Sequence, residues 1–420
     1  MRGVRDVCRG VLALLAFPLS TRLTAQVAPS VSRDSAGIRI IDNAAPVWAP
    51  GKGWTLSSSP MLTIGPDGGP ASQFSRIASA IQLGNGLIVV AERAQLQLRF
   101  FDAAGRHVRT VGGKGQGPGE FADIGMVMPL PGDSLAVESV RHTSIFAPDG
   151  QFVRHVRYGP FAPGLLQVPF VAVLGRFGNG TAVVGDFPQG RHAPRGAARW
   201  VDSSTLLLVD QSGAVIRDVG RVPAAAFAAS VGAPTPLTFG PEMVHASTMN
   251  RVYMGFGNDF AIREYDDSWT LRRIIRRAFT PRPFTTPELD AYVDAWMTMW
   301  SKETGAKRDR ERLAQINAPF PDALPAFSDL LASPTGELWL RDASLSGAPA
   351  CWCLSGLSDI PSTWSVFHAD GRWLGAVQMP ARFTPTDVGA DYVLGHLRPL
   401  DGAPRVVMYR IVKPRSGSGF

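Results

Sequence analysis

Five ionisable residues recur at the ends of strand-like runs, and they are the main candidates for chemistry in this sequence. Each follows or closes a short run in which apolar residues alternate with others, as in residues 86–92. The five residues are Glu92, Glu138, Asp186, Asp342 and His396. If the runs are arranged around one axis, these side chains converge at one end of it, and carboxylate oxygens suit calcium. The alternative is that each acidic side chain bonds the backbone of a neighbouring turn.

The common catalytic motifs are missing from the sequence. It contains no Gly-x-Ser-x-Gly elbow and no His-Glu-x-x-His zinc motif. The glycine run at residues 112–119 lacks the Gly-Lys-Ser/Thr ending of a phosphate-binding loop, and it joins two strand-like runs rather than a strand and a helix. We therefore interpret this run as a connector between structural units.

One segment, residues 281–320, departs from the strand-and-turn pattern. A Thr-Pro pair at residues 286–287 favours a helix start. Trp296 and Trp300 then fall on one helical face together with Leu289 and Val293. Two roles are open for this helical insert. It either packs its Trp face on the ring as structural padding, or it forms a lid whose tryptophans contact a ligand.

Internal repeats determine the expected fold. Residues 101–111 align with residues 146–156, an offset of 45, and residues 64–74 align with residues 111–121, an offset of 47. Fainter copies continue the series to six units. A repeat of about 45 residues with about four short strands is typical of a propeller blade. We therefore predict an all-β, six-bladed β-propeller over residues 26–420, with the helical insert between blades four and five.

The last unit contains sequence for only three strands. We expect residues 54–64 to supply its outer strand and so to tie the ring shut, because radial closure hides the edges of the sheets. Residues 37–43 are expected to form a further extended piece.

Composition agrees with many short strands joined by turns. The 420 residues include 44 Gly and 34 Pro, and 45% of them are hydrophobic and 18% charged, which argues against a disordered chain and an integral membrane protein. The formal net charge is +7. It falls to about +4 without the first 25 residues, which is too mild a charge to indicate nucleic-acid binding.

The first 25 residues are typical of a secretory signal peptide. A basic stretch with Arg2, Arg5 and Arg9 precedes an apolar run at residues 11–19 that is too short to span a bilayer, and Ala25 is a suitable cleavage position. We expect a secreted or periplasmic protein after cleavage, and a monomer. Its remaining cysteines, Cys351 and Cys353, form a strained bridge, pair with another chain or contribute to a metal site.

The chain resembles the six-bladed propellers built of NHL-like repeats in secreted bacterial proteins. The resemblance rests on Phe-Asp-Ala-Ala-Gly at residues 101–105, on the glycine-rich stretch at residues 112–121, on its copy at residues 65–74 and on residues 34–43. It covers nearly all of the mature chain and is clearest in the first two blades. In such repeats an acidic residue after the central alternating strand usually bonds the neighbouring turn. Relatives of this architecture include lactonases and amidating lyases.

Two functions follow as hypotheses. The first is a secreted binding or scaffold module that holds a protein, peptide or glycan at one mouth of the ring. The alternative is a metal-dependent lactonase-like hydrolase or lyase with its site in the central channel. The residues proposed to contact a ligand are Glu92, Glu138, Asp186, Asp342, His396, Trp296 and Trp300. A divalent cation such as calcium is the cofactor that the acidic positions suggest.

Overall fold

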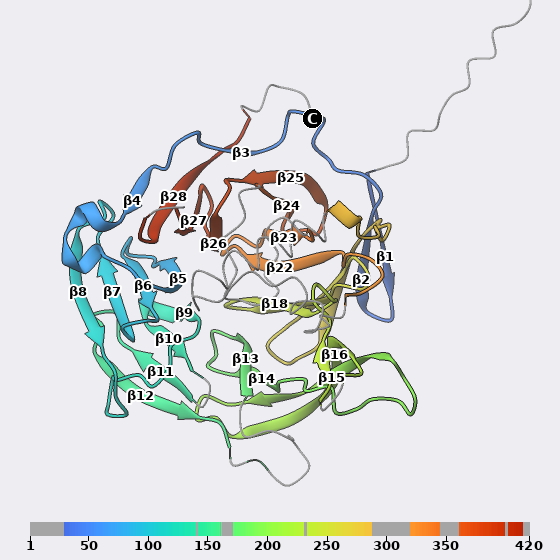
Figure 1. Cartoon of the computed structure of the whole chain (residues 1–420), viewed down its shortest axis with the longest axis horizontal. Coiled ribbons are helices and arrows are strands. Elements are labelled where there is room, and N and C mark those ends of the chain that lie inside the picture. Colours follow the sequence, from blue (N-terminus) through green and yellow to red (C-terminus); the bar gives the residue numbers. More distant parts are fainter. Residues whose placement is uncertain are drawn as a thin grey trace, which may run out of the picture.

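Six sheets follow one another around a central axis in the computed structural model, and their strands are antiparallel apart from one parallel pair in the fourth sheet (Figure 1). The structure describes residues 29–139, 142–159, 161, 171–230, 233–287, 320–344, 361–399 and 402–414. Each sheet is one blade, and the strand nearest the axis is the first one that the chain contributes to that blade after residue 76. The predicted six-bladed all-β propeller is therefore confirmed.

Blades one to three follow the chain order from the axis outwards. Blade one contains β5 (Ile77–Gln82), β6 (Ile88–Glu92), β7 (Gln97–Phe101) and β8 (His107–Gly112). Blade two contains β9 (Val127–Pro129), β10 (Leu135–Glu138), β11 (His142–Phe146) and β12 (Phe152–Arg157). Blade three contains β13 (Val171–Arg176), β14 (Ala182–Asp186), β15 (Arg199–Val209), β16 (Val215–Ala228) and the short β17 (Thr235–Pro236).

Blades four and six also include strands from the N-terminal part of the chain. Blade four contains β18 (Met243–Thr248), β19 (Arg251–Phe256), β20 (Ala261–Tyr265) and β21 (Leu271–Arg277), extended by β2 (Ile38–Asn43) and β1 (Ser30–Ser35). Blade five contains β22 (Phe327–Ala332), β23 (Leu338–Asp342), β24 (Ser362–Phe367) and β25 (Trp373–Met379). Blade six contains β26 (Phe383–Val388), β27 (Tyr392–Leu397) and β28 (Arg405–Val412), with β3 (Thr55–Leu56) and β4 (Leu62–Ile64) paired to β28.

Apolar side chains fill the spaces between neighbouring blades. On β6, Val89 and Ala91 pack toward blade two, whereas Ile88 and Val90 pack toward blade six. This alternation follows from the pleat, which sends successive side chains to opposite faces of a strand. Because each blade is covered on both faces, second strands such as β6 and β10 are mainly apolar on both faces rather than on one.

A repeated turn joins the third and fourth strands of the blades. In blade one, Asp102 accepts hydrogen bonds from the backbone N–H groups of Ala104 and Arg106, and Gly105 has a positive φ of 78°. Asp210 and Gly213 form the same turn in blade three. An aspartate side chain closes such a turn and glycine accepts the left-handed conformation without strain, which explains the repeated Asp and Gly in the sequence.

Arginine side chains on the fourth strands link successive blades. Each donates a hydrogen bond to a backbone carbonyl in the third-to-fourth-strand turn of the next blade. The four links are Arg109 to Pro148 (2.8 Å), Arg154 to Gln211 (2.7 Å), Arg217 to Ser268 (2.7 Å) and Arg273 to Ala369 (2.7 Å). In the first three of these links the arginine belongs to a repeated Val-Arg or Ile-Arg pair of the outer strand, which is thus part of the contact between blades.

The N-terminal segment closes the ring as predicted. Residues Leu62–Ile64 and Thr55–Leu56 pair with β28 in blade six. The extended piece expected at residues 37–43 is β2, which pairs in parallel with β21 of blade four. Between them, Val47 and Trp48 bond to the backbone of β25 in blade five. Figure 1 shows this segment in blue along the outside of the ring. We call residues 29–64 the N-terminal belt.

The glycine run is a connector between blades one and two, as predicted. Residues 113–126 join β8 to β9. Phe121 is buried within the core shared by these blades, and its ring would lie 2.4 Å from a Cβ at Gly112. The matching segment with the 3-10 turns η1 (Pro66–Gly68) and η2 (Pro70–Ser72) joins blade six to blade one.

Several predictions fall outside the part of the chain that the structure describes. The helical insert at 281–320 lies mainly in residues 288–319, which include Trp296 and Trp300, and Cys351 and Cys353 lie in the gap at 345–360. The proposed signal peptide also lies outside. These remain predictions. In the described ranges, no helix is both long and apolar enough to cross a lipid bilayer.

Candidate functional site

The two ends of the ring differ in the length of their connecting segments. At one end, short turns such as residues 102–106, 147–151 and 210–214 join the strands. At the other end lie the longer segments 113–126, 187–198 and 237–242, together with the described parts of two further connections, residues 278–287 with 320–326 and residues 343–344 with 361. We call the second end the long-loop mouth. Each second strand ends there, so the four predicted carboxylates have their backbones at this mouth.

Glu92 bonds to the backbone just before the first strand of its own blade and just after its second strand. Its buried carboxylate accepts hydrogen bonds from the N–H groups of Ser75 (3.2 Å), Arg76 (2.9 Å) and Ala94 (3.2 Å). This is the turn-bonding alternative considered from the sequence. Three donors occupy the carboxylate, which leaves it poorly placed to bind a cation as well.

Asp186 and Asp342 have similar local partners. The Asp186 carboxylate accepts a hydrogen bond from the N–H of Thr205 at 2.6 Å, and burial raises its pKa. Asp342 accepts a hydrogen bond from the Ser365 hydroxyl at 2.8 Å and lies 3.4 Å from Arg277. Burial also raises the pKa of Asp342. Arg277 comes from β21 of the preceding blade, so this pair links blades four and five.

Glu138 belongs to a buried network between blades two and three. Its carboxylate lies 3.0 Å from Nε of Arg176, and the two side chains are 10% and 7% exposed. Thr143 donates to Glu138 at 2.5 Å, and Tyr158 bonds to both Thr143 and Arg176. Burial, followed by the charge of Glu138, raises the pKa of Tyr158 to about 12. The partners satisfy one another, as buried charges require.

His396 is separate from the carboxylates. Burial lowers its pKa to about 4, and the charge of Arg398 acts in the same direction, so the imidazole is neutral at pH 7. Among the residues that the structure describes, no three His, Cys, Asp or Glu side chains are grouped closely enough to hold a metal ion. The expected convergence of the five predicted residues on one cation site is not seen.

An extension of blade three reaches beyond the rest of that sheet at the long-loop mouth. Pairing of β14 with β15 stops at Gly185 and Leu206, whereas β15 continues to pair with β16 from Thr205 back to Arg199. We call residues 187–205 and 220–228 the blade-three extension. Its inner face contains the stacked rings of Trp200 and Phe227, 6.2 Å apart.

Three contacts fix this extension to the ring. Ala226 donates its N–H to Pro241 at 3.2 Å and accepts from Leu237 at 2.8 Å. Arg199 forms an ion pair of 2.7 Å with Asp322, which lies just before blade five. The extension is therefore attached to the ring by backbone hydrogen bonds and an ion pair, and it does not project as an isolated hairpin.

A histidine and an aspartate pair on this extension, which the sequence analysis did not identify. His192 Nδ1 lies 2.7 Å from Oδ1 of Asp202 and 3.3 Å from Nη2 of Arg221. Burial alone would raise the pKa of Asp202, but the hydrogen bonds from His192 and from the Ser203 backbone lower it. The two residues are ten positions apart in the sequence, and this spacing matches no known motif, so the sequence did not predict the pair.

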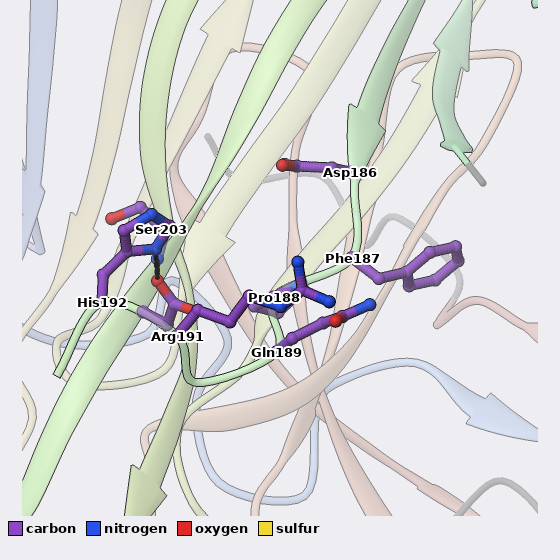
Figure 2. Close-up of a pocket in the computed structure, with 8 residues that line it drawn as sticks. Asp186, Phe187, Pro188, Gln189, Arg191, His192 and Ser203 are labelled. Carbon is purple, nitrogen blue, oxygen red and sulfur yellow. Dashed lines mark hydrogen bonds and ion pairs between the residues drawn. The ribbon is translucent and has the colours of Figure 1, made fainter. Parts of the chain in front are cut away.

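Figure 2 shows the shallow depression around this pair, with the bond from His192 dashed and the ring of Phe187 pointing away. Its volume is about 10 Å³, enough for about one water molecule. The His192 side chain is 39% exposed and the Asp202 side chain 2%. An exposed imidazole held by a buried carboxylate can transfer a proton, or it can contact an anion when it is protonated. The depression is nevertheless too small to enclose a substrate.

A larger groove lies at the same mouth in blade four. It has a volume of about 250 Å³ and lies between the loop at residues 258–261 and the segment at residues 276–281. Phe260 is buried at its base, under the guanidinium of Arg277 at 4.0 Å. Both depressions are therefore at the end with the long segments.

Comparison with known proteins supports the fold. A family model described as a 6-bladed beta-propeller (DUF5128) matches residues 73–127, which comprise blade one and the connector to blade two. No curated protein sequence matches the chain.

Three solved structures align with most of the chain. A putative exported protein from Bacteroides fragilis has a TM-score of 0.50 and 12% identity, over 89% of this chain and 100% of that one. A DUF4221 member from Bacteroides vulgatus has a TM-score of 0.46 and 10% identity, over 86% and 98%. A gluconolactonase from Xanthomonas campestris has a TM-score of 0.39 and 12% identity, over 81% and 87%. At these identities the likeness concerns the fold alone.

Proposed function

We propose that this protein is an exported binding module that holds a protein, peptide or glycan ligand at the long-loop mouth. The observation that carries the proposal is the difference between the two ends of the ring. Short hydrogen-bonded turns are sufficient to join the strands, as one end demonstrates. Long segments gathered at the other end are typical of a binding face on a rigid scaffold.

The contacts of the predicted acidic residues favour binding over catalysis at the mouth. Glu92, Glu138 and Asp342 are engaged by backbone N–H groups, an arginine or a hydroxyl. Their role in the proposal is to hold the blade entrances rigid, so that the long segments are presented on a fixed base. Rigid presentation reduces the entropy lost on binding.

Export is part of the same proposal. Residues 1–25 have the basic start, short apolar run and small residue of a signal peptide. The similar protein from Bacteroides fragilis is itself described as a putative exported protein. N-terminal sequencing of the protein recovered from a periplasmic or culture fraction is expected to begin near Gln26. An intact N-terminus in the cytoplasmic fraction would contradict export.

Ligand screening followed by hydrogen exchange tests the binding proposal. Immobilised protein is screened against peptides and glycans, and amide exchange is then measured with and without the best ligand. We expect protection in residues 187–198, 237–242 and 257–260, and none in the turns at 102–106, 147–151 and 210–214. Protection confined to those turns would refute the proposed face. Metal-dependent hydrolysis of a lactone would instead support the enzymatic alternative.

A further inference from the structure

The blade-three extension carries a concentration of positive charge. Residues 187–201 and 220–229 contain four arginines and one histidine and no Asp or Glu. The basic residues are Arg191, His192, Arg195, Arg199 and Arg221, and all five are exposed. Three carboxylates lie near them: Asp202, which is buried and bonds to His192, Asp322, which pairs with Arg199, and Asp186, which interacts electrostatically with Arg221.

Apolar side chains lie exposed beside this charge. Phe187 is 50% exposed and Val201 is 46% exposed. Phe187 precedes the arginine loop, with its ring pointing away from His192 (Figure 2), and Val201 shares the exposed face of β15 with Arg199. A surface that combines guanidinium groups with accessible apolar groups is complementary to a protein segment that has both acidic and apolar side chains. A sugar polymer with carboxylates would use the charges but not the apolar groups.

The blade-three extension is built so that its charges remain in place. The Trp200 and Phe227 rings and the backbone bonds of Ala226 hold one face of the extension in place, and the Asp202 carboxylate holds the imidazole of His192. Arg221 lies on the neighbouring strand, 3.3 Å from that imidazole. Fixed positive groups of this kind steer acidic partners during association and set the register of binding.

We propose that the blade-three extension is the docking surface for an acidic, partly apolar peptide segment of another protein. This inference rests on the proposed binding function and names the class of ligand and the part of the mouth that takes it. Carboxylates of the peptide pair with Arg191, Arg195 and Arg221, and an apolar side chain lies against Phe187 or Val201.

Fluorescence anisotropy with a labelled peptide tests the docking surface. The probe is a short peptide of Glu and Asp with one Phe, compared with a Lys-rich peptide of the same length and with polygalacturonate. We expect the acidic peptide to bind more tightly than either, and to lose roughly tenfold in affinity between about 50 and about 300 mM salt, because exposed pairs are screened.

Charge-matched triple variants separate this surface from general attraction. The test variant is R191Q/R195Q/R221Q, and the control is R33Q/R106Q/R372Q, whose arginines lie on β1 and in turns at the other end of the ring. Each removes three positive charges. Three arginines are replaced together because each exposed ion pair contributes little by itself. We expect the test variant to weaken peptide binding by roughly tenfold or more and the control variant to weaken it by less than about twofold. Circular dichroism and melting confirm that both fold.

The outcomes also separate this inference from the proposed function. Equal losses in the two triple variants, or tighter binding of polygalacturonate than of the peptide, would overturn the docking surface. A screened ligand that protects the long-loop mouth in hydrogen exchange but binds R191Q/R195Q/R221Q normally would overturn the surface and leave the binding function standing.

Discussion

Single residues in this ring matter most where a charge is buried between blades. Glu138 was singled out from the sequence because it ends a strand, but its partner Arg176 belongs to the next blade, 38 residues away. Sequence spacing cannot indicate such a pair, since the twist and packing of two blades bring the side chains together. The structure places Glu138 in a contact between blades two and three.

Replacing Glu138 by Gln is expected to destabilise the protein by about 3–5 kcal/mol, because it leaves the buried Arg176 without its counter-charge. Urea unfolding measures the change. Arg33→Gln, which removes an exposed ion pair with Asp42, is the control and is expected to cost less than about 1 kcal/mol. Similar small effects for both variants would show that Glu138 and Arg176 are not a buried pair in solution.

His396 is expected to make the fold sensitive to acid. Its pKa is lowered to about 4 in the folded state, so at pH values between about 4 and about 6.5 the histidine is protonated in the unfolded chain but neutral in the folded protein. The contribution of neutral His396 to the free energy of unfolding is therefore fully present above a pH of about 6.5. It is lost as the pH falls from there through about 4, and the loss reaches about 3 kcal/mol. Unfolding in urea at pH 7 and pH 4.5 measures this loss, and His396→Gln should reduce it. An equal loss in the variant would contradict the assignment.

Among the structural elements, the repeated turns were predictable and the blade-three extension was not. The alignment of residues 101–111 with 146–156 reflects the Asp or Pro-Asp turn, its glycine and the outer-strand arginine, all of which have local or next-blade partners. By contrast, residues 199–205 and 220–228 have no repeat, and the alanines of β16 give no clear alternation. The parallel pairing of β2 with β21 was also missed, because a strand's sequence does not specify a distant parallel partner.

The turn glycines also hold the blades together, which gives a prediction at this scale. Gly213 has a φ of +91°, and a Cβ there would lie 2.2 Å from the carbonyl oxygen of Arg157 in the preceding blade. Gly213→Ala is therefore expected to destabilise the protein by at least about 2 kcal/mol through strain and displacement of the backbone. Gly196 is the control, because it has a φ of +75° but no atom within 4 Å of an added Cβ. Gly196→Ala therefore measures the backbone strain alone and should destabilise the protein by about 1 kcal/mol. Thermal unfolding compares the two, and an equal cost would refute the contact.

The whole molecule depends on a segment that is distant in sequence from the blades it closes. The N-terminal belt contacts blades four, five and six, so three of the six blades receive backbone hydrogen bonds from residues 29–64. Buried Asn43 shows how closely it is integrated. Its side chain donates to the carbonyls of Arg276 and Gly371 and accepts from Trp373, which joins β2 to the adjacent blades four and five.

Deletion of residues 26–64 is expected to destabilise the entire ring. It uncovers the edges of β21 and β28 and removes the backbone partners of Met408 and Ile411, so blade six becomes an open three-stranded sheet. Because the blades share their cores, we expect one cooperative transition with a melting temperature lower by on the order of 10 °C or more, measured by calorimetry.

A shorter deletion provides the control for the belt. Removing residues 26–35 takes away β1, an exposed outermost strand that pairs with β2, and the Pro29 carbonyl that accepts from Ala44 and Ala45, and it leaves β2, Asn43 and the closure of blade six in place. We expect it to melt within about 2 °C of the full protein. If both deletions melted like the full protein, the blades would be held together without the belt. If the shorter deletion alone produced the whole effect, the stabilising contact would be β1, and the pairing of residues 55–64 with β28 would be secondary.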